Sequence, residues 1–148
     1  MRSIASWVQT FIALGSTFSA AQFTGPTIRG NGVTYQGTHN ASGNTDYFLS
    51  IPFAQPPVGT QRFKPPVAWS PSGSDTVIDA TTYGPSCPQG LADYISDTSE
   101  DCLTLHIWKP SNVTEKLPVM VWIYGGGFYF GTALSYEGWY IVQPSITI

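Results

Sequence analysis

An apolar run that ends in three consecutive glycines constrains this 148-residue chain more than any other feature. Residues 117–124 are almost all apolar, which is typical of a strand buried on both faces in the middle of an α/β sheet. Gly125, Gly126 and Gly127 follow directly. Glycine permits turns that other residues avoid and lets a ligand approach the backbone N–H groups. The run therefore predicts a strand followed by an oxyanion-binding loop, although the triplet alone also fits a flexible turn.

Turn signals and hydrophobic periodicity divide the rest of the chain into short elements. The turn at 30–32 favours a hairpin between strands at 27–29 and 33–38. Apolar and polar residues alternate in 103–108, which predicts a strand with two unlike faces that forms a hairpin with 117–124 and enters the central sheet. The remaining predicted elements are strands at 47–51, 76–80 and 145–148, a long proline-rich loop at 52–74, a turn at 110–115 and a short helix at 136–143.

The composition is that of a globular protein, with 42% hydrophobic and 10% charged residues and a formal net charge of −3. Six basic residues are scattered among nine acidic ones, so the sequence predicts no nucleic-acid partner. It contains no Gly-x-x-x-x-Gly-Lys motif for phosphate and no Cys/His cluster with the spacing of a metal site. No cofactor and no metal are implied. The length permits one domain.

The first residues have the features of a signal peptide at 1–21. Arg2 provides a short positive start, residues 4–14 are largely apolar, and the small residues 19–21 precede a cleavage site before Gln22. The apolar stretch is interrupted by polar residues and is shorter than the ~20 residues of a transmembrane helix. We therefore expect a secreted, extracellular protein with no transmembrane segment. The alternative is an ordinary buried first helix.

Two sequons and two cysteines agree with secretion. Asn40 and Asn112 each begin an Asn-x-Ser/Thr glycosylation sequon in a polar stretch that is expected to be an exposed loop. Cys87 and Cys102 can form one disulfide in an oxidising compartment, which would stabilise the fold by roughly 3 kcal/mol through loop entropy. The alternative is two buried thiols.

Three further motifs, in this order, give the chain a family resemblance. They are Ile-Pro-Phe-Ala-Gln-Pro-Pro-Val-Gly at 51–59, Arg-Phe-Lys-Pro-Pro at 62–66 and Glu-Asp-Cys-Leu-Thr-Leu-His-Ile-Trp-Lys-Pro at 100–110. With the glycine loop, they resemble the amino-terminal part of the type-B carboxylesterase/lipase family, which includes cholinesterases and secreted fungal lipases. The resemblance implies an α/β-hydrolase fold in which residues 22–148 are a truncated amino-terminal portion, roughly the first quarter of the family's domain.

The catalytic triad of such enzymes is absent from these residues. The Gly-x-Ser-x-Gly elbow that presents the serine in this fold does not occur. Its nearest match is Gly-Pro-Ser-Cys-Pro at 84–88, so Ser86 is interpreted as a loop residue. The family's acidic residue and histidine would follow later, and neither His39 nor His106 is expected to be a general base. At His106 the family commonly has asparagine, and we expect a solvent-facing or sheet-edge histidine.

The resemblance also implies roles for residues of the glycine loop. Gly126 and Gly127 correspond to the oxyanion-hole donors, and Gly125 supports the turn. Phe128 and Tyr129 are expected either to pack in the core or to line the substrate pocket.

Two structural pairs also follow from the resemblance. The family joins the cysteine of the Glu-Asp-Cys-Leu motif to one shortly upstream, which implies a Cys87–Cys102 disulfide. It also implies an ion pair between Arg62 and Glu100 that connects the long loop to the hairpin.

The expected function is that of a secreted carboxylic ester hydrolase, a serine esterase or lipase. The 148 residues alone are expected to be inactive, because they lack the nucleophile. Alternatives are a catalytically inactive cholinesterase-like binding or adhesion protein and a non-functional truncated product. Lipid, feruloyl-type and choline esters fit the aromatic loop equally well, and the sequence does not indicate an oligomeric state.

Overall fold

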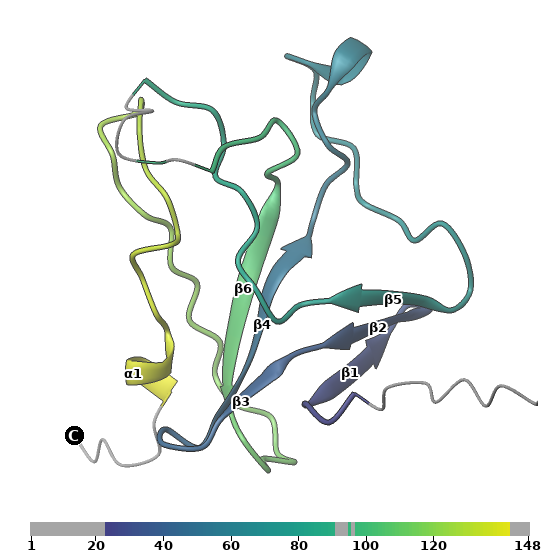
Figure 1. Ribbon diagram of the computed structural model, residues 1–148, viewed down its shortest axis with the longest axis vertical. Helices are drawn as coiled ribbons and strands as arrows, with labels where there is room; N and C mark the ends of the chain where they lie inside the picture. Colours follow the sequence, from purple (N-terminus) through teal and green to yellow (C-terminus); the bar gives the residue numbers. More distant parts are fainter. Residues whose placement is uncertain (1–22, 91–94, 96, 143–148) are drawn as a thin grey trace, which may run out of the picture.

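The structure is a computed structural model that describes residues 23–90, 95 and 97–142. These residues form two three-stranded sheets, with strand orders β1-β2-β5 and β3-β4-β6. The two sheets meet along one side, and a single helical turn, α1, lies beside the lower end of the second sheet (Figure 1). The predicted signal peptide at 1–21 and the predicted strand at 145–148 lie outside the described residues.

The first sheet begins with the predicted hairpin. Strand β1 (Thr27–Gly30) pairs antiparallel with β2 (Val33–Gln36), and β2 pairs in parallel with β5 (Thr76–Asp79). The two residues of the hairpin turn, Asn31 and Gly32, have φ values of 51° and 77°. Tight two-residue turns need this left-handed backbone, which asparagine and glycine tolerate best. The predicted hairpin and the predicted strand at 76–80 are therefore confirmed.

The second sheet has its longest strand in the middle. Strand β4 (Thr45–Pro52) pairs antiparallel with β3 (Thr38–Asn40) on one side and with β6 (Thr104–Pro110) on the other. The β4–β6 register shifts within β4, where Ser50 has a φ of 55°. This irregularity is a β-bulge, which bends the strand locally.

The core lies where the two sheets meet. Gly37 connects β2 to β3, and a Cβ atom there would lie 2.5 Å from the carbonyl oxygen of Tyr47 and 2.6 Å from the ring of Phe48. Only glycine allows so close a crossing. The N–H of Leu49 donates to the carbonyl of Ala80 at 2.8 Å and joins the sheets. The buried apolar side chains are Val33, Phe48, Leu49, Ala54 and Ala80.

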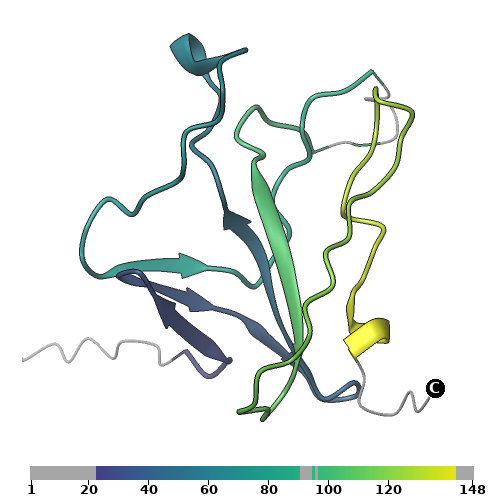
Figure 2. The same ribbon diagram turned by 180° about the vertical axis from the view of Figure 1, so that it is seen from behind.

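The proline-rich segment at 52–74, which was predicted to be a long loop, is a loop in the structure. It contains a single 3-10 turn, η1 (Gly59–Gln61), which stands away from both sheets at the top of Figures 1 and 2. The loop then returns to β5 around the outside of the molecule.

The predicted strand at 117–124 is not formed, and so neither is its hairpin with β6. The segment has no regular secondary structure, and its side chains are exposed, reaching 87% at Val119 and 82% at Ile123. A strand that is apolar on both faces needs hydrogen-bonded neighbours and a cover on each face. The part of the chain described by the structure supplies none of these for this segment. The apolar sequence of 117–124 is typical of a buried strand, but the described residues provide no neighbouring strand for it.

Strand β6 has the predicted alternation of apolar and polar residues, but the face that carries its apolar side chains is the more exposed one. Leu105 and Ile107 are 39% and 43% exposed, while His106 between them is half-buried. The predicted helix at 136–143 is represented by α1 (Trp139–Val142), which packs near β6. No helix in the described ranges is both long and apolar enough to cross a membrane.

Candidate functional site

The glycines expected to form an oxyanion hole occupy a tight turn. Gly126 and Gly127 have φ values of 149° and 62°, which favour glycine. A Cβ atom on Gly126 would lie 1.5 Å from the carbonyl oxygen of Phe130, so no side chain fits there. The Gly126 carbonyl accepts the N–H groups of Tyr129 at 3.3 Å and Phe130 at 3.2 Å, which closes the turn. Gly125 has open space around its Cα.

The backbone donors of this turn are free to bind a ligand. The N–H groups of Gly126 and Gly127 have no acceptor among residues 23–90, 95 and 97–142. Backbone N–H groups are strong donors, and donors held in place before the reaction stabilise a developing oxyanion without reorganisation. The turn therefore offers two adjacent donors at the protein surface.

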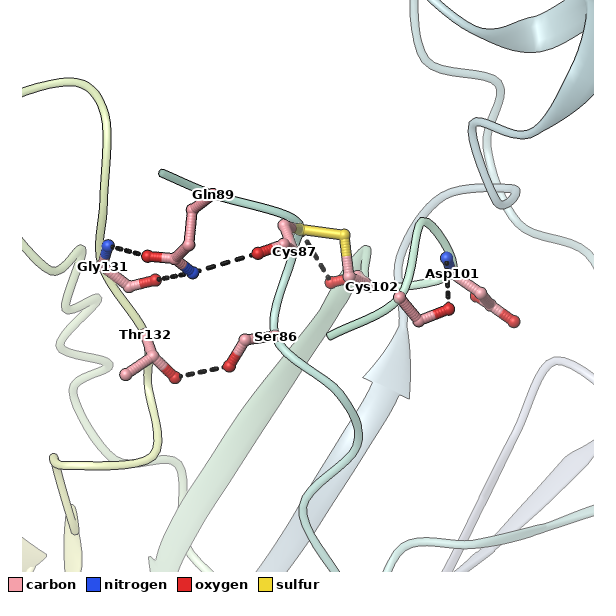
Figure 3. Close-up of a disulfide and its surroundings, with 8 residues drawn as sticks. Ser86, Cys87, Gln89, Asp101, Cys102, Gly131 and Thr132 are labelled. Carbon is pink, nitrogen blue, oxygen red and sulfur yellow. Dashed lines mark hydrogen bonds between the residues drawn. A yellow bond between two sulfur atoms is a disulfide. The ribbon is translucent and has the colours of Figure 1, made fainter. Parts of the chain in front are cut away.

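The far end of the glycine loop is attached to the segment after β5 (Figure 3). The side-chain oxygen of Gln89 accepts the N–H of Gly131 at 2.6 Å, and its amide nitrogen donates to the Gly131 carbonyl at 3.0 Å. The hydroxyl groups of Ser86 and Thr132 lie 2.8 Å apart. Sequence reasoning missed Gln89, because its contact with Gly131 spans 42 positions and leaves no local signal.

A disulfide joins this segment to the start of β6. Cys87 and Cys102 are bonded, with their Cα atoms 5.1 Å apart, and they are 15 positions apart in sequence. Nearby, Nη1 of Arg62 lies 2.8 Å from Oε1 of Glu100, with side chains 59% and 39% exposed. The long loop, the disulfide and the glycine loop are thus connected to the same end of β6.

A small hollow lies beside the disulfide, and His106 lies in its wall. The Nδ1 atom of His106 accepts the N–H of Ser50 at 2.9 Å, and the ring of Tyr83 packs edge-on at 4.8 Å. Burial lowers the pKa of this imidazole. His106 lies on the last strand of the sheet order, as expected for a sheet-edge residue, but its ring is not solvent-facing because it turns inward onto Tyr83. Cys87, Tyr124 and Thr132 also line the hollow.

A second polar cluster contains a serine, a histidine and an aspartate but has no triad geometry. Ser111 Oγ at 3.1 Å and Asp46 Oδ1 at 2.8 Å both approach Nδ1 of His39. A catalytic triad needs the serine and the carboxylate on opposite ring nitrogens. Here the Ser111 hydroxyl donates to Asp46 at 2.7 Å instead. The sequence did not predict Ser111 as a partner, because its contacts are all distant in sequence.

This cluster stabilises a charged carboxylate. Burial alone would raise the pKa of Asp46, but hydrogen bonds from Ser111, His39 and Lys109 and the charge of Lys109 hold that pKa below its ordinary value. Nζ of Lys109 lies 3.0 Å from Oδ2 of Asp46. The cluster therefore links β3, β4 and β6 and has a structural role.

The aromatic residues after the glycines lie on the surface. Phe128 is fully exposed with a φ of 69°, and Tyr129 is 63% exposed. Tyr129 packs edge-on against Phe130 at 5.0 Å. Neither Phe128 nor Tyr129 belongs to the core or lines the hollow beside His106.

Both sequons occupy turns. Asn112 is exposed at the turn after β6, with a φ of 59°. Asn40 ends β3, and its side-chain oxygen accepts the N–H groups of Ser42 at 3.1 Å and Gly43 at 3.3 Å.

Comparisons with known proteins agree on one group of enzymes. The sequence model described as "Carboxylesterase family" matches residues 19–148. Lipase 2 of Diutina rugosa is 38% identical, over 91% of this chain and 28% of the lipase. Carboxylesterase 1C of Rattus norvegicus is 44% identical, over 62% of this chain and 19% of its own length. The chain thus spans less than a third of the length of these relatives.

Solved structures give the same result for the fold. EstA of Aspergillus niger matches 80% of this chain with a TM-score of 0.69 and 35% identity, over 23% of that protein. A thermophilic pNB esterase matches 73% of this chain with a TM-score of 0.58 and 38% identity. The two sheets are therefore part of an α/β-hydrolase fold, as the motifs implied.

Proposed function

Because the chain belongs to the carboxylesterase family, we propose that it provides the oxyanion-hole loop of a secreted carboxylic ester hydrolase. The observation that carries this proposal is the turn at Gly126 and Gly127, whose two adjacent N–H groups have no acceptor within the described residues. The steric limit at Gly126 supports it, because this position accommodates no side chain.

The proposed reaction is acyl transfer. A serine attacks the ester carbonyl, a histidine removes the serine proton and later protonates the leaving group, and an acidic residue orients the histidine. Gly126 and Gly127 donate to the oxyanion of the tetrahedral intermediate, and the residue after the serine supplies a third N–H. One such donor lowers the barrier by roughly 2.7 to 4 kcal/mol.

The serine, histidine and acidic residue are proposed to lie in sequence that follows these 148 residues. The support is twofold: no Gly-x-Ser-x-Gly motif occurs here, and relatives such as Lipase 2 are matched over only 28% of their length. His39 and His106 are not proposed as the missing base. Asp46 and Ser111 both approach the same nitrogen of His39, and Nδ1 of His106 accepts the Ser50 N–H instead of donating to a carboxylate, so neither ring has the contacts of a triad histidine.

Secretion and glycosylation belong to the same proposal. The leader-like residues 1–21, the exposed sequon at Asn112 and the Cys87–Cys102 disulfide all fit an oxidising, extracellular environment. Asn40 is proposed as the second glycan site.

The substrate is proposed to be a small-molecule or lipid ester. The open position of Phe128 and Tyr129 beside the donors suits an acyl or alcohol pocket that further chain completes. The relatives include a lipase, a para-nitrobenzyl esterase and an acetylcholinesterase, so their names alone do not select one ester class.

Sequencing the transcript past the Ile148 codon tests the proposal. We expect an in-frame Gly-x-Ser-x-Gly elbow followed by an acidic residue and a histidine, and nitrophenyl-ester hydrolysis by the complete product. A stop codon at that point would contradict the proposal, and a continuing frame that lacks the serine would favour a binding or adhesion protein. The 148 residues alone are expected to hydrolyse no nitrophenyl ester.

A further inference from the structure

Gln89 makes three hydrogen bonds through one side-chain amide. Its Oε1 accepts the N–H of Gly131 at 2.6 Å, and its Nε2 donates to the carbonyl oxygens of Gly131 and Cys87, each at 3.0 Å. Gly131 therefore has both backbone polar groups paired with one side chain. A carboxamide provides the acceptor oxygen and the two N–H donors that this arrangement uses.

These bonds are the attachment of the glycine loop to the rest of the described chain. Within residues 125–131, the other hydrogen bonds are local, from Tyr129 and Phe130 to the Gly126 carbonyl. In the described part of the protein, no other hydrogen bond leaves this stretch. The next contact outward is that of Thr132 with Ser86.

The loop is folded so tightly that its two ends are in contact. A Cβ atom on Gly131 would lie 2.6 Å from Cδ2 of Tyr124 and 2.7 Å from the carbonyl oxygen of Gly125. A Cβ atom on Gly126 would meet the Phe130 carbonyl. Because Gly131 lies against Gly125 and Phe130 lies against Gly126, we expect a displacement of Gly131 to displace Gly125 and Gly126.

The base of the attachment is linked covalently to the segment that begins β6. Gln89 lies two positions after Cys87, which is bonded to Cys102 just before β6. The carbonyl of Cys87 is itself one of the groups that Gln89 binds. Figure 3 shows this series of contacts, from the disulfide through Gln89 to Gly131.

The geometry points to Gln89 as the positioning residue of the oxyanion-hole loop: it connects the loop to the disulfide and sets the place of the Gly126 and Gly127 donors. This inference rests on the proposed function for its catalytic consequence but not for the attachment itself. Gln89 does not touch the reacting atoms.

Hydrogen exchange on the complete encoded protein tests the attachment without any assay of activity. Gln89→Ala is expected to speed exchange of the Gly131 N–H by at least about tenfold, because that proton loses its acceptor. Gln89→Glu keeps an acceptor but loses both donor contacts, and it is expected to give a smaller increase. Gln61→Ala, at an exposed position in η1, is the matched control and is expected to leave Gly131 unchanged.

Ester hydrolysis by the same proteins tests the positioning. Misplacement of an oxyanion donor acts on the transition state, so Gln89→Ala is expected to lower kcat by about 10- to 100-fold with KM nearly unchanged. A merely structural role would reduce the amount of folded enzyme and leave kcat per folded molecule unchanged. Gln89→Glu, the closest isostere, keeps the test usable if Gln89→Ala fails to fold.

Unchanged exchange at Gly131 in Gln89→Ala, or in Gln89→Glu where the alanine variant does not fold, would overturn the inference. Faster exchange with unchanged kcat would overturn the positioning role. A wild-type protein that hydrolyses no ester would contradict the proposed function instead, and exchange at Gly131 would still decide whether Gln89 holds the loop.

Discussion

The backbone N–H of Ser50 donates a 2.9 Å hydrogen bond to Nδ1 of His106, across the bulge in the β4–β6 pair. The bond requires an unprotonated Nδ1, so the neutral imidazole carries its proton on Nε2. Burial favours the same neutral form and lowers the pKa of His106. The bulge is therefore sensitive to pH.

We expect the free energy of unfolding to fall as the pH drops below the unfolded His106 value of 6.5. The folded pKa is lower than the unfolded one, so the unfolded state binds more protons in this range. The stabilisation is complete above 6.5 and declines as the pH falls toward the folded pKa. Urea unfolding of wild type and His106→Asn at several pH values measures the effect. Equal pH slopes in the two proteins would show that His106 is not the group responsible.

Asp46→Asn is expected to destabilise the fold by about 1.5 to 3 kcal/mol at neutral pH, because three donors lose a charged acceptor. The lowered pKa of Asp46 means that its stabilisation is present above the unfolded value of 3.8 and is lost as the pH falls through the folded value. The difference between variant and wild type should therefore shrink in acid, as measured by urea unfolding. Asp75→Asn is the control, since Asp75 is paired with Arg29 but 80% exposed. A loss as large in Asp75→Asn would argue against the role of burial.

The Arg62–Glu100 pair is expected to contribute less than about 1 kcal/mol, because exposed pairs are screened by water and salt. Both side chains are well exposed, at 59% and 39%. A double-mutant cycle with Arg62→Glu and Glu100→Arg measures the coupling by thermal unfolding. The charge-reversed double variant should recover the stability lost in each single variant, and no recovery would refute the pairing.

Replacing both Cys87 and Cys102 with alanine is expected to cost roughly 3 kcal/mol, from the closure entropy of a 15-residue loop. Denaturant unfolding of the double variant measures this cost. Wild type treated with a reductant should show a similar loss. An unchanged midpoint would mean that native strain cancels the entropy gain.

Alanine at the two donor glycines should have unequal effects on folding. At Gly127, a Cβ atom would meet only Tyr129 at 3.4 Å, so the cost is the left-handed backbone, about 1 to 2 kcal/mol. At Gly126, the Phe130 carbonyl lies in the way, and the turn must open. Thermal unfolding should rank Gly126→Ala as clearly less stable than Gly127→Ala. The reverse order would contradict the turn described here.

Local chemistry explains which elements could be predicted. The β1–β2 hairpin was predictable because asparagine and glycine, at positions 31 and 32, tolerate the left-handed backbone that the turn requires. The long loop before β5 was predictable from its prolines. The glycine turn was predictable because its three glycines are consecutive and the hydrogen bonds that close it join neighbouring residues.

Non-local contacts explain the rest. The apolar run at 117–124 indicates a strand, but a strand exists only with partners, and hydrophobicity does not supply them. The parallel pairing of β5 with β2 and the attachment by Gln89 also join distant segments, so no local pattern reveals them. Ser111 reaches Asp46 across 65 positions for the same reason.

The β4–β6 pair also determines the order in which this region can fold during translation. Asp46 and Lys109, which face each other in it, are 63 positions apart. A ribosome adds roughly 5 to 20 residues per second, so β4 is made several seconds before its partner. During that delay only the β3–β4 hairpin of the second sheet is available, and the side of β4 that will receive β6 is an unpaired edge. Nascent chains at this stage are thus expected to be the species most in need of a chaperone.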